Sequence, residues 1–151
     1  MLDKSRNGQD FEIIIASLLE HYGIAYERQW VPGWQDPVGQ TVRIDFRLHD
    51  LEEWPDGLCV EAKLQDSPGT AWQKIAYAID SIKTSFQLPS ILIVDGLAAQ
   101  KAMRYARSKA GNSLQAVLTF MEFRAACQNL SNGTSKAVFR RQFDPDQQKL
   151  F

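Results

Sequence analysis

The sequence predicts an α/β fold in which a mixed sheet, built around a central β-hairpin, is flanked by helices. Residues 41–48 and 58–65 alternate apolar and polar side chains on either side of segment 54–57, which contains Pro-Asp-Gly. Alternation with period two around such a turn is typical of a hairpin with one buried face. Residues 90–94 contain the apolar run Ile-Leu-Ile-Val after a predicted helix, which indicates a central strand, covered on both faces and parallel to a neighbour.

A first helix is expected over residues 8–22, because its apolar residues recur at the spacing of one helical face. Gly23 is well placed to end it. Glu12 lies at the rim of the apolar stripe, so its carboxylate either points toward the acids of the hairpin or complements the helix dipole. The predicted apolar face consists of Phe11, Ile14, Ile15, Leu18, Leu19 and Tyr22.

Residues 24–31 are predicted to form an edge strand, and residues 32–39 form a loop that is too rich in Gly and Pro for regular structure. Trp30 and Trp34 lie near this loop. Tryptophans in such places either stack on a ligand or cap the core, and the sequence leaves both interpretations open.

The hairpin determines which side chains lie together. If its turn is centred near Glu53, Asp45 lies across from Glu61, and Arg43 lies across from Lys63. Because side chains alternate strictly along a strand, the two acids and Lys63 emerge on one face and the aliphatic residues share the other. The expected buried face consists of Val42, Ile44, Phe46, Leu48, Leu58, Val60, Ala62 and Leu64.

Directly opposed carboxylates repel, so this pair suggests a divalent cation held between them by oxygen ligands. The charge distribution agrees with that interpretation. Residues 43–66 hold seven acids and three bases, a net −4, although the whole chain carries only −1. Residues 97–142 hold eight bases and one acid, a net +7. The first segment suits a metal ion and the second suits a polyanion, unless its bases simply solvate helix surfaces.

A helix is expected from about Thr70 to Thr84, because Thr70 and Gln73 form a capping-box pattern before an apolar stripe. Its first turn would lie just after the strand that carries Glu61. The free amides, Thr70, Gln73 and Lys74 could then hold a phosphate, although a routine cap with a solvated lysine explains the pattern equally. The apolar stripe consists of Trp72, Ile75, Ala76, Ile79 and Ile82.

The second half of the chain continues the alternation of helices and strands. A helix over residues 97–109 packs through alanines and Met103 and turns Lys101, Arg104 and Arg107 away from that side. Residues 114–118 are predicted to form the last strand. Thr119 and Glu122 cap a final helix, whose apolar residues are Phe120, Phe123, Cys127 and Leu130.

The expected domain organisation is one globular domain over residues 1–130 and a C-terminal arm over residues 131–151. The arm contains Arg140 and Arg141, so it is expected to dock on a partner subunit or on nucleic acid. A length of 151 residues with 44% apolar side chains is enough for one domain with its own core.

Composition excludes several classes of protein. The two cysteines, far apart in the chain, give no disulfide framework, and we expect a cytoplasmic protein without a leader or a membrane span. There is no Cys-x-x-Cys motif, and His21 and His49 are the only histidines. These counts argue against a zinc site, a histidine-centred nuclease and a Ser/His/Asp hydrolase.

Together these residues resemble the PD-(D/E)XK nuclease superfamily, which has the restriction-endonuclease-like fold. The resemblance rests on Asp45, on Glu61-Ala62-Lys63 sixteen residues later, on Gly8-x-x-Phe11-Glu12 before them, and on Gln65 and Gly69-Thr70-Ala71-x-x-Lys74 after them. It covers about residues 8–120. One departure is that Asp45 follows Ile44 rather than proline, whereas Pro55-Asp56 lies in the predicted turn.

The resemblance implies a role for each of these residues. Asp45 and Glu61, with the Ala62 carbonyl, would bind Mg²⁺, with Mn²⁺ as a substitute. Lys63 would orient or help to deprotonate the attacking water. Glu12 would complete the site through a water molecule, Gln65 fits a Glu-x-Lys-x-Gln variant, and Lys74 would contact phosphate.

The implied activity is cleavage of double-stranded DNA at specific sites by a restriction-type or intron-homing endonuclease. Cutting both strands needs two active sites, which favours a homodimer or a higher even oligomer. The alternatives are a structure-selective enzyme similar to Holliday-junction resolvases and a noncatalytic DNA-binding relative. The residues expected to contact DNA are Trp34, Thr70, Gln73, Lys74, Lys101, Arg104, Arg107, Arg140 and Arg141.

Overall fold

The computed structural model describes residues 8–64, 71–96 and 99–131. Their five strands form one sheet in the order β1 to β5. Strands β1 to β3 are antiparallel, and β3, β4 and β5 are parallel, so the predicted mixed sheet is confirmed. The strands are β1 (Tyr26–Trp30), β2 (Ile44–Leu48), β3 (Leu58–Leu64), β4 (Ser90–Asp95) and β5 (Leu114–Leu118).

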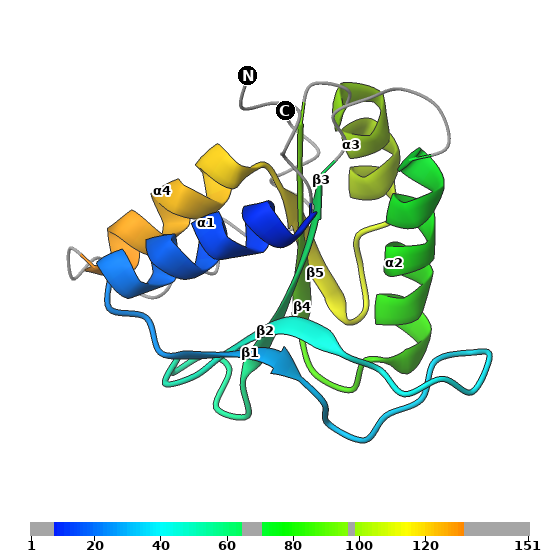
Figure 1. Ribbon diagram of the computed structural model, residues 1–151, viewed down its shortest axis with the longest axis horizontal. Coiled ribbons are helices and arrows are strands. Elements are labelled where there is room, and N and C mark those ends of the chain that lie inside the picture. The colour runs from blue at the N-terminus through cyan, green and yellow to red at the C-terminus, as the bar shows by residue number, and fades with distance from the viewer. Residues whose placement is uncertain (1–7, 65–70, 97–98, 132–151) are drawn as a thin grey trace.

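Helices cover both faces of this sheet (Figure 1). The helices α1 (Gly8–His21) and α4 (Phe120–Ser131) lie on one face, and α2 (Ala71–Ser85) and α3 (Ala99–Ser108) lie on the other. Since α2 joins β3 to β4 and α3 joins β4 to β5, each is the crossover that a parallel pair requires. None of the helices in the described ranges is long and apolar enough to span a bilayer.

The core has two layers, one on each face of the sheet. The first core layer lies between the sheet and helices α1 and α4, and it includes Phe46, Val60, Ile91 and Phe123. The second core layer lies between the sheet and helices α2 and α3. It includes Cys59, Ile75, Ile82, Leu92, Val94 and Val117. Strand β4 contributes alternate residues to both layers, as expected for a central strand covered on both faces.

The predicted register of the hairpin is confirmed over Phe46–Leu48. The predicted pairs of Asp45 with Glu61 and of Arg43 with Lys63 lie outside this ladder, and one of the predicted faces is wrong. Phe46 pairs with Val60 and Leu48 pairs with Leu58, as the position of the turn implied. Phe46 and Leu48 lie in the first core layer, whereas Val42 and Ile44 lie in the second. The chain therefore changes face between Ile44 and Phe46, so strict alternation holds only for the part of β2 that pairs regularly with β3.

The apolar stripe of α1 is narrower than predicted. Phe11, Ile15, Leu18 and Leu19 are buried, but the side chain of Ile14 is 48% exposed. Helical spacing alone places Ile14 on the apolar side. The side of α1 nearest to the sheet is buried, and Ile14 stays exposed although α4 lies beside α1 on this face (Figure 1).

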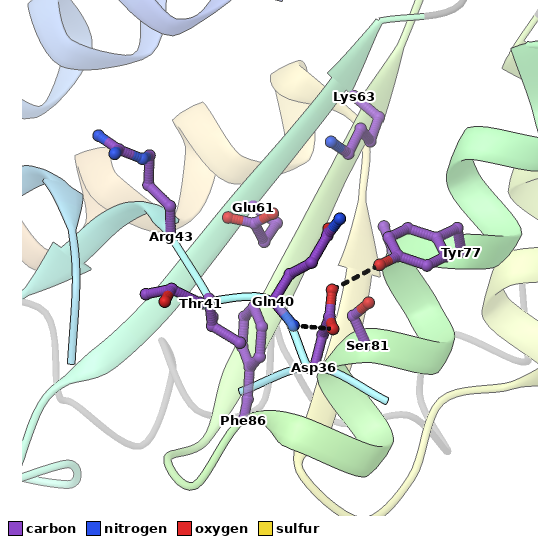
Figure 2. Close-up of a pocket in the computed structure, with 11 residues that line it drawn as sticks. Asp36, Gln40, Thr41, Arg43, Glu61, Lys63, Tyr77, Ser81 and Phe86 are labelled. Atoms are coloured by element: carbon purple, nitrogen blue, oxygen red, sulfur yellow. Dashed lines mark hydrogen bonds between the residues drawn. The ribbon is translucent and has the colours of Figure 1, made fainter. Parts of the chain in front are cut away.

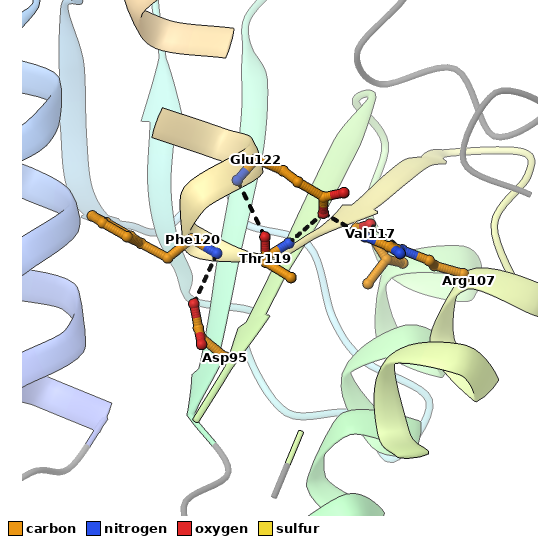
Figure 3. Close-up of polar contacts among 6 residues, drawn as sticks. All are labelled: Asp95, Arg107, Val117, Thr119, Phe120 and Glu122. Atoms are coloured by element: carbon orange, nitrogen blue, oxygen red, sulfur yellow. Dashed lines mark hydrogen bonds and ion pairs between the residues drawn. The ribbon is translucent and has the colours of Figure 1, made fainter. Parts of the chain in front are cut away.

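A polar network fixes the start of α4 against the ends of β4 and β5 (Figure 3). The predicted capping box is confirmed: Thr119 N–H donates to Glu122 Oε1 at 2.8 Å, and Glu122 N–H donates to Thr119 Oγ1 at 3.1 Å. Asp95, at the end of β4, accepts a hydrogen bond from the Phe120 N–H at 2.9 Å. Arg107 donates to the Val117 carbonyl and pairs with Glu122, so α3 is tied to the same point.

Candidate active site

The candidate site lies where β2 and β3 separate. Regular pairing of the two strands ends at Phe46 and Val60. Beyond that point, hydrogen bonds from backbone N–H groups to side-chain carboxylates replace the backbone ladder. Asp45 N–H donates to Glu61 Oε1 at 2.7 Å, and Ala62 N–H donates to Asp45 Oδ2 at 2.9 Å. The structure thus brings Asp45 and Glu61 together, and each carboxylate is held by the backbone of the opposite strand.

Burial makes this pair of acids electrostatically unfavourable in the absence of a cation. Glu61 is only 8% exposed. Burial, and then the charge of Asp45, raises the pKa of Glu61 to about 8. The pKa of Asp45 is raised to about 6. Burial is the main cause, the hydrogen bond from the Ala62 N–H opposes it, and the charge of Glu12 adds to the rise. Both groups therefore resist ionisation, and a cation between them would relieve the cost.

The oxygen atoms at this point suit a small hard cation. One oxygen of each carboxylate accepts a single backbone N–H, so both groups keep free acceptor capacity. The Ala62 N–H points toward β2. Because the N–H and the carbonyl of one strand residue point to the same side, the Ala62 carbonyl also points toward β2. No group of three or more His, Cys, Asp or Glu side chains in the described ranges could hold a metal. Two carboxylates with a carbonyl nevertheless fit Mg²⁺, which keeps several of its waters.

Lys63 follows Glu61 by two residues on β3, so both side chains leave the same face of the strand. They line one cavity of about 240 Å³ together with residues from the loop after β1 and from α2 (Figure 2). The charge of Lys63 acts on both acids and lowers the pKa of each, against the effect of burial. The three hairpin residues singled out from the sequence therefore occupy one electrostatic site.

Glu12 reaches this site from α1. Its Oε1 accepts hydrogen bonds from Gln29 at 2.6 Å and from Arg28 at 3.4 Å. Its charge also contributes to the raised pKa of both Asp45 and Glu61. Of the two orientations that the sequence allowed for Glu12, the structure has the one that points toward the acids of the hairpin.

Gln29 is a site residue that the sequence did not indicate. It donates to Glu12 and also hydrogen-bonds the Asp45 carboxylate, so it links the two acids. Its φ is +52°, which is unusual for a residue within a strand, and the β1–β2 ladder skips Gln29 and Asp45. On either side of Gln29, Tyr26 packs on the first core layer and Trp30 on the second. Both strands therefore change face at the same point.

Gln65 and the residues predicted to contact DNA fall into three groups. Gln73 and Lys74 are exposed on the first turn of α2, and Lys101 and Arg104 are exposed on α3. Gln65, Thr70, Arg140 and Arg141 lie outside the described residues.

Arg107 and Trp34 form the third group, because both have partners within the fold. Arg107 donates to the Val117 carbonyl and pairs with Glu122, which commits its guanidinium to the packing of α3 and α4. Trp34 packs partly buried against the second core layer, with its ring 5.5 Å from that of Trp30 and 6.1 Å from that of Phe86. We therefore leave both residues out of the proposed DNA-binding surface.

The fold and this cluster of two acids and a lysine define a restriction-endonuclease-like domain. The model of the PD-(D/E)XK nuclease superfamily domain matches residues 5–129 of the chain. The chain belongs to that superfamily and carries a nuclease domain, so the resemblance noted in the sequence is confirmed. No curated protein and no solved structure gave a significant match.

Proposed function

We propose that this protein is a Mg²⁺-dependent endonuclease that cleaves double-stranded DNA at specific sites, as restriction and homing endonucleases do. The observation that carries the proposal is the interlocked pair of Asp45 and Glu61 between two separating strands, with Lys63 on the same face of β3 as Glu61. Because both cysteines are free and buried, we also propose a reducing cytoplasm as its compartment.

In this mechanism Asp45, Glu61 and the Ala62 carbonyl would hold the cation. Bound Mg²⁺ would polarise the scissile phosphate and offset the charge that develops in the transition state. Lys63 donates a hydrogen bond to the attacking water and orients it toward phosphorus. The water oxygen forms the new bond to phosphorus and releases a proton to solvent, while the bond to the leaving sugar oxygen breaks and that oxygen takes up a proton from solvent. Gln29 and Glu12 hold Asp45 in position from the other side.

The proposed surface for DNA lies on the side of the sheet that carries α2 and α3. The cavity beside Glu61 and Lys63 opens on this side (Figure 2), and Lys74, Lys101 and Arg104 are exposed on the two helices. Lysine and arginine on one side of an active site provide the contacts to phosphate that position a duplex. We also propose a homodimer or a higher even oligomer, because cutting both strands needs two active sites.

A structure-selective nuclease similar to Holliday-junction resolvases is the second candidate, because the exposed Lys74, Lys101 and Arg104 suit phosphate contacts that do not depend on base sequence. A noncatalytic DNA-binding relative is the third. The burial of two acids beside a lysine counts against it, because such an arrangement costs free energy that a purely binding protein has no chemical reason to retain.

The direct test is cleavage of plasmid and junction DNA by the purified protein with Mg²⁺ or Mn²⁺ and with a chelator. We expect metal-dependent cutting by the wild type and none by Asp45→Asn, which keeps the size of the side chain. Cutting at one fixed sequence supports a restriction or homing enzyme, whereas cutting of four-way junctions of any sequence supports a resolvase. A folded wild type that is inert on all these substrates with either metal would favour the noncatalytic relative.

Loss of a phosphate contact on α3 should change the salt dependence of binding. We expect Lys101→Ala and Arg104→Ala each to weaken DNA binding and to reduce the slope of log K against log salt by about one unit. Arg124, exposed on α4 across the sheet, provides the matched control, and its replacement by alanine should leave the slope unchanged. Equal slopes for all three variants and the wild type would remove α3 from the DNA-binding surface.

Replacement of Gln29 separates its backbone conformation from its side chain. Glycine adopts a φ of +52° without strain, so Gln29→Gly should be at least as stable as the wild type in a chelator. Without the amide, Glu12 and Asp45 lose their link, and we expect the Mg²⁺ concentration for half-maximal cleavage to rise by about 10–100-fold. A smaller Mg²⁺-induced rise in melting temperature gives a second readout.

The matched control for this variant is Asn112→Gly. Asn112 has a similar φ of +54° but lies exposed just before β5. Its replacement should leave the Mg²⁺ dependence unchanged. If Gln29→Gly also kept the Mg²⁺ dependence of the wild type, Gln29 would matter only for the shape of the strand.

A further inference from the structure

The loop over residues 36–43 forms the outer wall of the cavity beside Glu61 and Lys63. Asp36 holds this loop together through hydrogen bonds. One oxygen of Asp36 accepts the N–H groups of Val38 at 3.0 Å and Gln40 at 2.8 Å, and the other accepts the Tyr77 hydroxyl of α2 at 2.8 Å. The loop is therefore fastened to α2, and the cavity lies between them and β3 (Figure 2).

The interior of the cavity combines apolar surface with polar groups. Val42, Ala78 and Phe86 contribute buried apolar surface. Ser81 is only 9% exposed, and its hydroxyl donates a hydrogen bond to the Tyr77 hydroxyl. A hydroxyl also has two acceptor lone pairs, so Ser81 keeps acceptor capacity for a ligand. The Gln40 side chain also extends across the cavity (Figure 2).

This chemistry does not favour an anion over a neutral ligand. Two carboxylates, Asp36 and Glu61, and two cations, Arg43 and Lys63, line the cavity, so their formal charges cancel. A nucleobase has apolar faces and polar edges, which correspond to the apolar surface and to the hydroxyl and amide groups. The volume of about 240 Å³ lies just below the range of about 300–1,000 Å³ that is typical of sites for drug-sized ligands, so the cavity suits a ligand no larger than one base.

We propose that this cavity binds the base of the nucleotide next to the scissile phosphate, after that base has left the helical stack. The proposal rests on the proposed nuclease function, because Glu61 and Lys63 form one end of the cavity and place the phosphate there. The apolar surface contacts the face of the base, and Ser81 and Gln40 hydrogen-bond its edge. Extrusion costs least when the base is already unpaired, so the enzyme prefers DNA with an unpaired base at the cleavage site.

The test is a binding measurement in a chelator, so that no cleavage is needed. Fluorescence anisotropy compares a plain duplex with the same duplex carrying one bulged nucleotide, and with a bulge that lacks its base. We expect the wild type to bind the base-containing bulge about tenfold more tightly than the abasic bulge. Ser81→Leu fills the cavity and should abolish this difference while affinity for the plain duplex changes by less than about twofold.

Two loop variants keep the test independent of folding. Gln40 is exposed, so Gln40→Ala should fold normally and should reduce the preference for the base-containing bulge. Val38 belongs to the same loop but is 71% exposed and does not line the cavity, so Val38→Ala should leave the preference intact.

Equal affinity of the wild type for the two bulges would overturn the proposal, and so would a preference that survives both Ser81→Leu and Gln40→Ala. The result of this binding test can be distinguished from the result of the cleavage test. DNA cutting without selectivity for the bulged base would refute this site alone, whereas selective binding without any cutting would refute the nuclease function and leave the base site standing.

Discussion

Lys63→Ala is expected to lower the rate of DNA cleavage by about 10²–10⁴-fold and to weaken DNA binding by less than about tenfold. Lys63 leaves the same face of β3 as Glu61 and lines the same cavity, so its ammonium can reach a water that attacks a phosphate beside the cation that the two acids would hold. Its loss removes a group that acts mainly in the transition state, and such a loss falls on kcat rather than on substrate affinity.

Single-turnover cleavage and equilibrium binding of the same DNA separate these two effects. Lys83→Ala is the matched control, because Lys83 donates to the Lys109 carbonyl at 2.7 Å from the far end of α2 and does not line the cavity. It should keep the cleavage rate of the wild type. If Lys63→Ala cleaved DNA at the normal rate, Lys63 would be only a surface charge and the proposed mechanism would fail.

Glu61→Gln is expected to stabilise the metal-free protein and to abolish cleavage. Burial and the Asp45 charge raise the pKa of Glu61 from 4.5 to about 8 in the folded protein. At pH values between 4.5 and about 8, Glu61 has lost its proton in the unfolded chain but still binds it in the folded chain. The free energy of unfolding therefore falls as pH rises through this window, by at most about 1.4 kcal/mol per pH unit for one such group. Glutamine keeps the acceptor for the Asp45 N–H and carries no charge.

Thermal unfolding from pH 5 to pH 8 in a chelator measures this effect. The wild type should lose stability toward pH 8, and Glu61→Gln should lose less. Added Mg²⁺ should raise the melting temperature of the wild type but not that of the variant, because a cation that binds only the folded state stabilises it. Asp80→Asn, an exposed acid on α2, controls for net charge and should follow the wild type. A variant less stable than the wild type at pH 8 would contradict the electrostatic account of this site.

Most of the elements could be predicted because their signals are local. The bounds of β5 and the capping box of Thr119 and Glu122 follow from residues a few positions apart. The register of the hairpin over Phe46–Leu48 also follows from its turn, and it places Asp45 and Glu61 near one another where the ladder ends.

The errors occur where distant elements meet. Ile14 fits the apolar stripe of α1, yet no neighbouring element covers it. The helix pattern left Arg107 free for DNA, yet the start of α4 supplies it with a partner in Glu122. In both cases the pattern was correct for the helix alone, and the neighbour that decided the outcome comes from another part of the chain.

The sequence by itself determined the order of helices and strands, the pairing of the hairpin and the three residues at the centre of the site. These depend on periodicity, turn chemistry and capping, which act over a few residues. Only the tertiary structure decided the change of face at Gln29 and Asp45, the link from Glu12 to Asp45, and the cavity closed by Asp36 and Tyr77. These features arise from contacts between segments far apart in the chain, where packing and burial outweigh the local preferences of each residue.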